Sequence, residues 1–424
     1  MCYRLVPCGP GIWGAVSTAR RVVLRAAALF DGVSGAILAR PSVVVANGTI
    51  AAVHGPGGSE PADAEVVDLP GLTLLPGLVD AHLHLCLDAT SDPVGHLAET
   101  DDALLREQMA EAAMRALRAG VTTVRDLGDR GYLALDLRAR GPASGAGPLP
   151  AIVAAGPPIT TPGGHCYFLG GAANGQRALR AAVRERAERG VDVIKVMASG
   201  GNLTPGSLPY EPQFGAGSLR VIVDEAHRHG LPVTAHAHSA RSIADAVTAG
   251  VDGIEHATFM SAGGVDAPEA VIRAIAARRI AVGWTVGRDP DQAGAVMPQI
   301  ASRMAGLRAA RRRLYESGAM LVPGSDAGVT PAKPHDVLRF APEDMAAAGL
   351  SPAEILQALT SGAAKACGLG HRKGRIAPGF DADILAIDGN PLEDIAAIRN
   401  LRAVYIGGQP ILPAPDSPAG SREP

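Results

Sequence analysis

The middle of the chain alternates between short apolar runs and longer amphipathic stretches. Apolar runs bounded by Gly, Pro or polar residues are typical of buried strands, and apolar residues at helical spacing indicate helices packed on one face. Eight strand candidates lie at residues 78–85, 121–128, 151–156, 191–199, 232–239, 253–259, 281–287 and 321–328. Helical patterns lie at residues 101–119, 176–189, 219–228, 239–249, 268–279, 298–316 and 351–367.

This alternation predicts an α/β fold with a parallel sheet, because each crossover helix returns the chain to the same end of the sheet. Eight repeats fit a (β/α)8 TIM barrel. A doubly wound open sheet is the main alternative. No G-x-G-x-x-G turn follows the first strand, so the sequence does not support dinucleotide binding.

Both ends of the chain show a different, β-rich pattern. Residues 43–50 predict a strand followed by an Asn-Gly hairpin turn, and residues 383–387 and 403–406 predict further strands. Two β-rich ends around a different middle predict one small β-sandwich built from both termini. The predicted parts are a disordered extension (1–21), a composite β-sandwich domain (22–75 plus 376–412), the barrel (76–375) and a disordered tail (413–424).

Composition narrows the possible partners and the compartment. The net charge is −3, and no basic run with interleaved aromatic residues is present, which argues against a nucleic-acid partner. No stretch approaches the ~18 apolar residues that span a bilayer, so no membrane partner is expected. The five cysteines include no C-x-x-C pair, which favours a reducing compartment, and we expect a cytoplasmic protein.

The first strand candidate carries two histidines, His82 and His84, among apolar residues. Residues i and i+2 of a strand point to the same side, so both imidazoles face one way. Neutral imidazole is a good ligand for zinc-like ions. A hydrogen-bonded core pair is the alternative, but it requires partners for several buried nitrogens. We therefore favour a metal site.

Four other strand candidates also carry polar residues where apolar ones are expected. Each histidine alone is more often a hydrogen-bonded core residue than a ligand, and a carboxylate after a strand often only caps a helix. Their joint occurrence favours one shared site, because active sites of such barrels lie at the carboxyl ends of the strands. These residues are Lys195, His236, His238, His256 and Asp326.

Lysine is scarce, since the chain has only four among its 39 basic residues. Lys195 lies inside the apolar run Val193–Met197, where a lone ammonium is strongly disfavoured. The ordinary interpretation is a lysine paired with a buried carboxylate. The alternative is a lysine converted to an anion that bridges two cations.

Taken together, these motifs resemble the amidohydrolase superfamily, and more narrowly its imidazolonepropionase-like and Xaa-Pro dipeptidase (prolidase)-like metal-dependent hydrolases. The resemblance extends from about residue 22 to residue 412, and its motifs are specific only as a set. The residues that carry it are Pro76-Gly77-Leu78-Val79-Asp80-Ala81-His82-Leu83-His84, Lys195, His236, Ile254-Glu255-His256 and Gly324-Ser325-Asp326.

The resemblance implies a two-metal centre, usually zinc, in a (β/α)8 barrel with a side β-sandwich. Within it, His82, His84 and Asp326 would bind the more buried ion, and His236 and His256 the other. Lys195, carboxylated by CO2, would bridge both ions. His238 is not an expected ligand; it would support a ligand or face the substrate.

Two cations lower the pKa of a shared water and polarise a substrate carbonyl. Hydroxide would then attack, and Asp326 would accept the proton and pass it to the leaving nitrogen. Two loops are expected to set substrate choice. In prolidase-like relatives a Gly-Gly-His motif is thought to contact the substrate, which suggests His165; the alternative is a solvent-exposed loop histidine. Tyr210 lies in a long Gly/Pro-rich loop of the kind that often forms lids.

The leading hypothesis is therefore a binuclear amidohydrolase that acts on a small molecule, with a dipeptide or an N-acyl amino acid favoured. A cyclic amide hydrolase or deaminase on the same scaffold is one alternative. A catalytically inactive relative that serves as an assembly protein is another, and the intact ligand set argues against it. We expect a small-molecule substrate and a homo-oligomer. Arg125 after the second strand is either structural or substrate-binding, and we favour a structural role.

Overall fold

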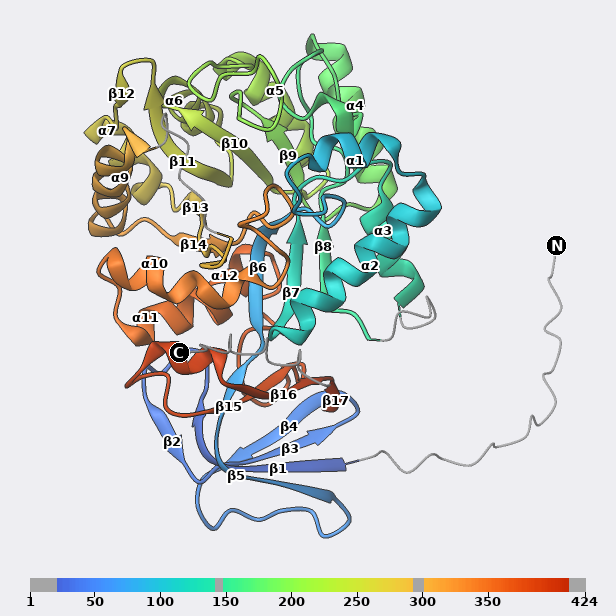
Figure 1. Ribbon diagram of the computed structural model, residues 1–424, viewed down its shortest axis with the longest axis vertical. Helices are drawn as coiled ribbons and strands as arrows, with labels where there is room; N and C mark the ends of the chain where they lie inside the picture. The colour runs from blue at the N-terminus through green and yellow to red at the C-terminus, as the bar shows by residue number, and fades with distance from the viewer. Residues whose placement is uncertain (1–20, 142–147, 293–300, 412–424) are drawn as a thin grey trace, which may run out of the picture.

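The computed structural model describes residues 21–141, 148–292 and 301–411. The predicted terminal extension, apart from Arg21, and the predicted tail lie outside the described residues. Figure 1 shows the molecule as strands surrounded by helices, with a sheet formed by both ends of the chain below them. No helix in the described ranges combines the length and apolar character that a membrane crossing requires.

Eight parallel strands of the described chain form the centre of the larger part (Figure 1). Neighbouring strands follow one another in sequence order, which excludes the doubly wound alternative. They are β6 (Leu78–Leu83), β7 (Val121–Asp126), β8 (Ala151–Ala154), β9 (Ile194–Met197), β10 (Val233–Ser239), β11 (Gly253–Ser261), β13 (Ala281–Thr285) and β14 (Leu321–Gly324).

The prediction of a closed barrel needs correction, because these strands form two sheets rather than one closed ladder. One sheet is β6-β7-β8; the other is β14-β13-β11-β10-β9, with the short β12 (Gly264–Val265) paired to β11. Among the described residues, the β-pairing between the two sheets consists of two isolated bridges, Leu83 to Ala327 and Ile159 to Val196. The four-residue β8 precedes Pro157-Pro158, which have no N–H to donate and interrupt the ladder there.

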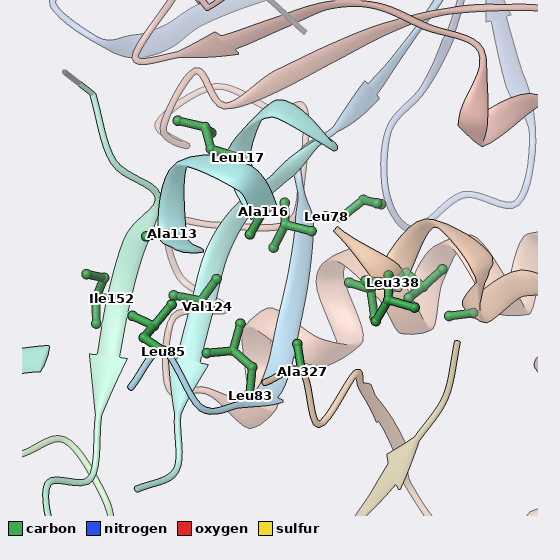
Figure 2. Close-up of a cluster of buried hydrophobic side chains, with 14 of the residues drawn as sticks. Leu78, Leu83, Leu85, Ala113, Ala116, Leu117, Val124, Ile152, Ala327 and Leu338 are labelled. Carbon is green, nitrogen blue, oxygen red and sulfur yellow. The ribbon is translucent and has the colours of Figure 1, made fainter. Parts of the chain in front are cut away.

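Helices cover the outer side of these strands, as the 3.6-residue pattern predicts. In α2 the side chain of Asp101 caps the first turn by accepting from the backbone N–H of Ala103 and Leu104. Figure 2 shows Ala113 and Leu117 of this helix in the apolar cluster with β6 and β7. The main helices are α1 (Pro93–Glu99), α2 (Asp102–Arg118), α3 (Leu133–Arg140), α4 (Gln176–Arg189), α5 (Ala216–Arg228), α6 (Ala240–Ala249), α7 (Glu269–Ala277), α9 (Met304–Glu316), α10 (Ala341–Ala347), α11 (Pro352–Gln357) and α12 (Ala363–Ala366).

The helix predicted at 351–367 is interrupted by a π-helical turn, η4 (Ala358–Gly362), between α11 and α12. Within it the hydroxyl of Ser361 donates to the carbonyl of Gly32 at 2.6 Å, outside the helix. Short 3₁₀ segments complete the described helical structure: η2 (Tyr167–Leu169), η3 (Val337–Phe340) and η5 (Ile395–Arg399).

The two ends of the chain share one sheet of eight strands among the described residues, in the order β17-β16-β15-β5-β1-β3-β4 with β2 paired to β1. The predicted sandwich of two sheets is thus a single mixed sheet, because the long β5 pairs with β1 along its length and with β15 near its end. The strands are β1 (Arg21–Phe30), β2 (Ile37–Ala39), β3 (Ser42–Ala46), β4 (Thr49–His54), β5 (Glu65–Pro76), β15 (Ile384–Asp388), β16 (Leu401–Ile406) and β17 (Gln409–Ile411).

Candidate metal centre

Strand β6 presents polar side chains on one side and apolar ones on the other. Leu83 and the following Leu85 lie in the apolar cluster shown in Figure 2. His82 and His84 alternate with them, and their rings lie 5.5 Å apart. Both histidines are buried. The strand period therefore places the two imidazoles together, as the sequence predicts.

Hydrogen bonds set the tautomer of both histidines. Nδ1 of His84 donates to the carbonyl of Gly128 at 3.0 Å, and Nδ1 of His82 lies 2.9 Å from a carboxylate oxygen of Glu255. These partners only accept, so the Nε2 atoms carry the lone pairs. Those atoms lie 3.4 Å (His82) and 3.5 Å (His84) from Oδ1 of Asp326. Two imidazole lone pairs and one carboxylate therefore converge.

Asp326 is held in place by contacts between β14 and β6. Its N–H donates to the carbonyl of His82 at 2.7 Å, and its φ of 56° lies in the left-handed region. Oδ1 of Asp80 accepts from the N–H groups of Ser325 and His82. A Cβ on Gly324 would lie 2.6 Å from the backbone nitrogen of His82, so only glycine permits this approach. The strained backbone at Asp326 is characteristic of functional sites.

Strands β10 and β11 supply three further imidazoles. The ring of His236 lies 4.7 Å from that of His238 and 4.6 Å from that of His256. His256 has a φ of 68°, and the register between β10 and β11 shifts just beyond it. In a regular strand, Glu255 and His256 would face opposite sides. Here Glu255 hydrogen-bonds to His82 while the His256 ring lies 5.1 Å from the His82 ring.

His236 and His238 each have one nitrogen engaged in a hydrogen bond. Nε2 of His236 donates to the carbonyl of Gly200 at 3.1 Å, which leaves Nδ1 as its lone-pair atom. The hydroxyl of Thr258 donates its one hydrogen to the carbonyl of His238 and therefore accepts from Nδ1 of that residue at 3.0 Å. Nε2 of His238 is consequently an unprotonated acceptor.

Burial keeps the imidazoles of His82, His238 and His256 neutral and thus able to bind a cation. Burial lowers the pKa of His82 and His256, and it lowers that of His238 to about 4. For Asp326, burial alone would raise the pKa, but the adjacent His82 and His84 hold it below its ordinary value. Neutral histidines beside an ionised carboxylate form a donor set suited to a divalent transition metal.

Two groups of side chains in the described chain bring three possible ligand atoms within 4.8 Å of one another: His82 with His256 and Asp326, and His236 with His238 and His256. His256 belongs to both groups. The second group contains His238, which the family pattern does not name as a ligand. His84 belongs to neither group, although its Nε2 faces Asp326.

Lys195 lies fully inside the molecule, with 1% of its surface exposed. In the described structure its Nζ has no hydrogen-bond partner, so the ordinary interpretation of a lysine paired with a buried carboxylate holds only through charge, exerted by Glu255 and Asp326 without a hydrogen bond. Burial lowers the pKa of Lys195 to about 8. A buried amine without a partner costs about 1–3 kcal/mol. An additional group bound at this nitrogen would remove that cost, so the residues present fit a bridged metal centre.

The two loop residues differ in their placement. His165 is 4% exposed, and its ring lies 4.7 Å from that of His236, so the alternative of a solvent-exposed loop histidine is wrong. Its Nδ1 lies 3.2 Å from the hydroxyl oxygen of Thr204, and burial lowers its pKa to about 3. Tyr210 is partly exposed and makes no hydrogen bond or ring contact with a described residue. The structure therefore brings His165 into ring contact with His236, whereas Tyr210 makes no such contact with a described histidine.

Sequence reasoning gave no role to Glu255, although it is a charged residue within an apolar strand. Its carboxylate accepts from His82, from Nη2 of Arg125 and from the hydroxyl of Thr234. Burial opposes its ionisation, but Arg125 and His82 hold its pKa well below the usual range. Arg125 also donates to the carbonyl of Ala81 at 2.7 Å, which agrees with the structural role favoured for it.

Comparison with known proteins gives independent matches. The model for the Amidohydrolase family matches residues 73–411. Ochratoxinase from Aspergillus niger is 28% identical over 365 residues, which cover 78% of this chain and 73% of that protein. Imidazolonepropionase from Deinococcus deserti is 31% identical over 186 residues, covering 43% of this chain and 42% of that one. The crystal structure of a Xaa-Pro dipeptidase with bound methionine in the active site has a TM-score of 0.80 and 28% identity, over 92% of this chain and 99% of that chain. These matches confirm the resemblance predicted from the sequence.

Proposed function

The chain belongs to the amidohydrolase family of metal-dependent hydrolases that act on C–N bonds, and from this premise we propose that it hydrolyses the amide bond of a dipeptide or an N-acyl amino acid. The observation that carries the proposal is the convergence of neutral imidazoles, one ionised carboxylate and an unpartnered buried amine. His82, His84 and Asp326 would hold one ion, and His236 and His256 a second. Lys195 would connect the two as a carbamate.

Two divalent ions, for which the nitrogen-rich donor set favours Zn2+, would supply a water of lowered pKa and polarise the scissile carbonyl. The residues of the chain handle the protons. Asp326, held ionised, accepts a proton at a carboxylate oxygen and returns it to the nitrogen that leaves. Nε2 of His238 offers an acceptor to an N–H or O–H group of the substrate. Burial keeps Lys195 partly in the neutral amine form, which is the form that reacts with CO2.

The relatives support an amino-acid-like substrate. One solved structure of similar fold is a Xaa-Pro dipeptidase with methionine bound in its active site. We infer that His165, beside His236, contacts such a substrate from the loop after β8. The likeness to imidazolonepropionase favours a second candidate, hydrolysis of a cyclic amide on the same scaffold.

Metal loading and a substrate screen test the proposal together. We expect about two equivalents of zinc per chain and hydrolysis of at least one dipeptide or N-acyl amino acid. Removal of the metal with a chelator should abolish turnover, and zinc should restore it. Turnover of cyclic amides alone would favour the second candidate. A protein that binds no metal and turns over none of these compounds would instead support the alternative of an inactive assembly protein.

Thr258→Val tests the role given to His238. The valine cannot accept from Nδ1, so the imidazole loses the contact that keeps Nε2 unprotonated. We expect kcat/KM to fall about 10-fold, the lower end of what loss of a supporting hydrogen bond costs in metal sites, while the metal content stays unchanged. The measurement is steady-state kinetics with metal analysis of the same samples. A loss of metal in this variant would make His238 a ligand instead.

A further inference from the structure

We infer that Glu255 is a positioning residue that fixes which nitrogen of His82 faces the metal centre. The inference rests on the proposed function only in taking the centre to be a metal site. Glu255 is 1% exposed and lies on β11, next to His256. It belongs to neither group of possible metal ligands.

Three strands direct donors at this one carboxylate. Oε2 accepts from Nδ1 of His82 on β6 at 2.9 Å. Oε1 accepts from Nη2 of Arg125 on β7 at 3.1 Å and from the hydroxyl of Thr234 on β10 at 2.7 Å. The two carboxylate oxygens therefore accept from different donors: Oε2 from the histidine, and Oε1 from the arginine and the threonine.

The space around the carboxylate admits little movement. A Cβ on Gly283 of β13 would lie 1.9 Å from Oε2, so the glycine leaves room that the carboxylate occupies. The Arg125 guanidinium is itself anchored, because its Nε donates to the carbonyl of Ala81 at 2.7 Å, directly before His82. Arg125 thus connects Glu255 to β6, the strand that carries His82.

The carboxylate of Glu255 determines which nitrogen of His82 carries the hydrogen. An ionised carboxylate only accepts, so Nδ1 must carry the hydrogen and Nε2 the lone pair. Nε2 is the atom that lies 3.4 Å from Oδ1 of Asp326. With the opposite tautomer, an N–H group would point at the centre in place of a ligand atom.

Glu255→Gln tests this with almost no change of shape. Arg125 is always a donor, so the glutamine oxygen must face it, and the NH2 group must face His82. The amide then donates to Nδ1 and reverses the tautomer. We expect metal affinity to fall 10- to 100-fold, measured by competition with a chelator. Imidazole 15N spectra of the metal-free protein should show His82 protonated at Nδ1 in the wild type and at Nε2 in the variant.

Glu225→Gln is the matched control. Glu225 on α5 is also largely buried, and it pairs with Arg180, Arg184 and Arg228 and makes no contact with the histidines of the candidate metal centre. It should keep wild-type metal affinity and the wild-type His82 spectrum. Gly283→Ala is a second test, because its Cβ displaces Oε2 without changing charge, and we expect a similar loss of affinity.

Unchanged metal affinity in both Glu255→Gln and Gly283→Ala, or an unchanged His82 tautomer in Glu255→Gln, would overturn the inference. Failure of the proposed function gives a different result, since a wild type that binds no metal still reports the His82 tautomer in its spectrum. The spectrum therefore decides the role of Glu255 even in that case.

Discussion

Asp326→Asn is expected to lower kcat about 100- to 10,000-fold, the range that a positioned acid–base group contributes. The carboxamide has nearly the shape of the carboxylate but cannot accept a proton at neutral pH. Oδ1 of Asp326 lies within 3.5 Å of Nε2 of both His82 and His84, so an amide there also weakens a ligand position. Kinetics at saturating zinc, with metal analysis of the same samples, separates loss of proton transfer from loss of metal.

Asp252→Asn is the control for this substitution. Asp252 accepts from the backbone of Val233 and from His227 just before β11, at the amino ends of the strands. We expect its turnover to remain within about twofold of the wild type, since a surface substitution away from a functional site usually changes the free energy of unfolding by less than about 0.5 kcal/mol. Full turnover by Asp326→Asn would refute the role of Asp326 as proton carrier.

Lys195→Met is expected to have opposite effects on stability and on metal binding. In the metal-free protein the amine of Lys195 is buried without a hydrogen-bond partner among the described residues. Methionine fills similar space without a polar atom, so we expect the metal-free protein to become more stable by about 1–3 kcal/mol. The same variant should bind fewer than two metal ions and lose activity, because it cannot form the bridging carbamate. Chemical denaturation without metal and metal titration measure the two effects.

Lys365→Met provides the comparison, since Lys365 on α12 is exposed and should change neither quantity. Carboxylation itself predicts that wild-type metal loading depends on dissolved CO2, whereas loading of Lys195→Met does not. Two bound equivalents and normal turnover in Lys195→Met would exclude a bridging role.

Local periodicity explains the part of the site that could be predicted. The alternation along residues 78–85 places His82 and His84 on one side, and Leu83 and Leu85 pack into the apolar cluster on the other. The repeat of strands and helices likewise predicts that the polar residues of the later strands lie at the same edge, the carboxyl ends of the strands. Nothing along the chain shows how the strands close: between β8 and β9, where Pro157-Pro158 follow β8, an isolated bridge from Ile159 to Val196 replaces the expected ladder.

The sequence by itself determined the α/β repeat, the family and the strand positions of the candidate ligands, because these depend on residue type and spacing. Only the tertiary structure decided which side chains meet. The left-handed backbone at His256 lets adjacent residues, Glu255 and His256, both reach His82, where a period of two would have separated them. The tertiary structure also left Lys195 without a hydrogen-bond partner in the described chain and buried His165 against His236. Such contacts join residues distant in sequence, and their geometry depends on the packing of several strands at once.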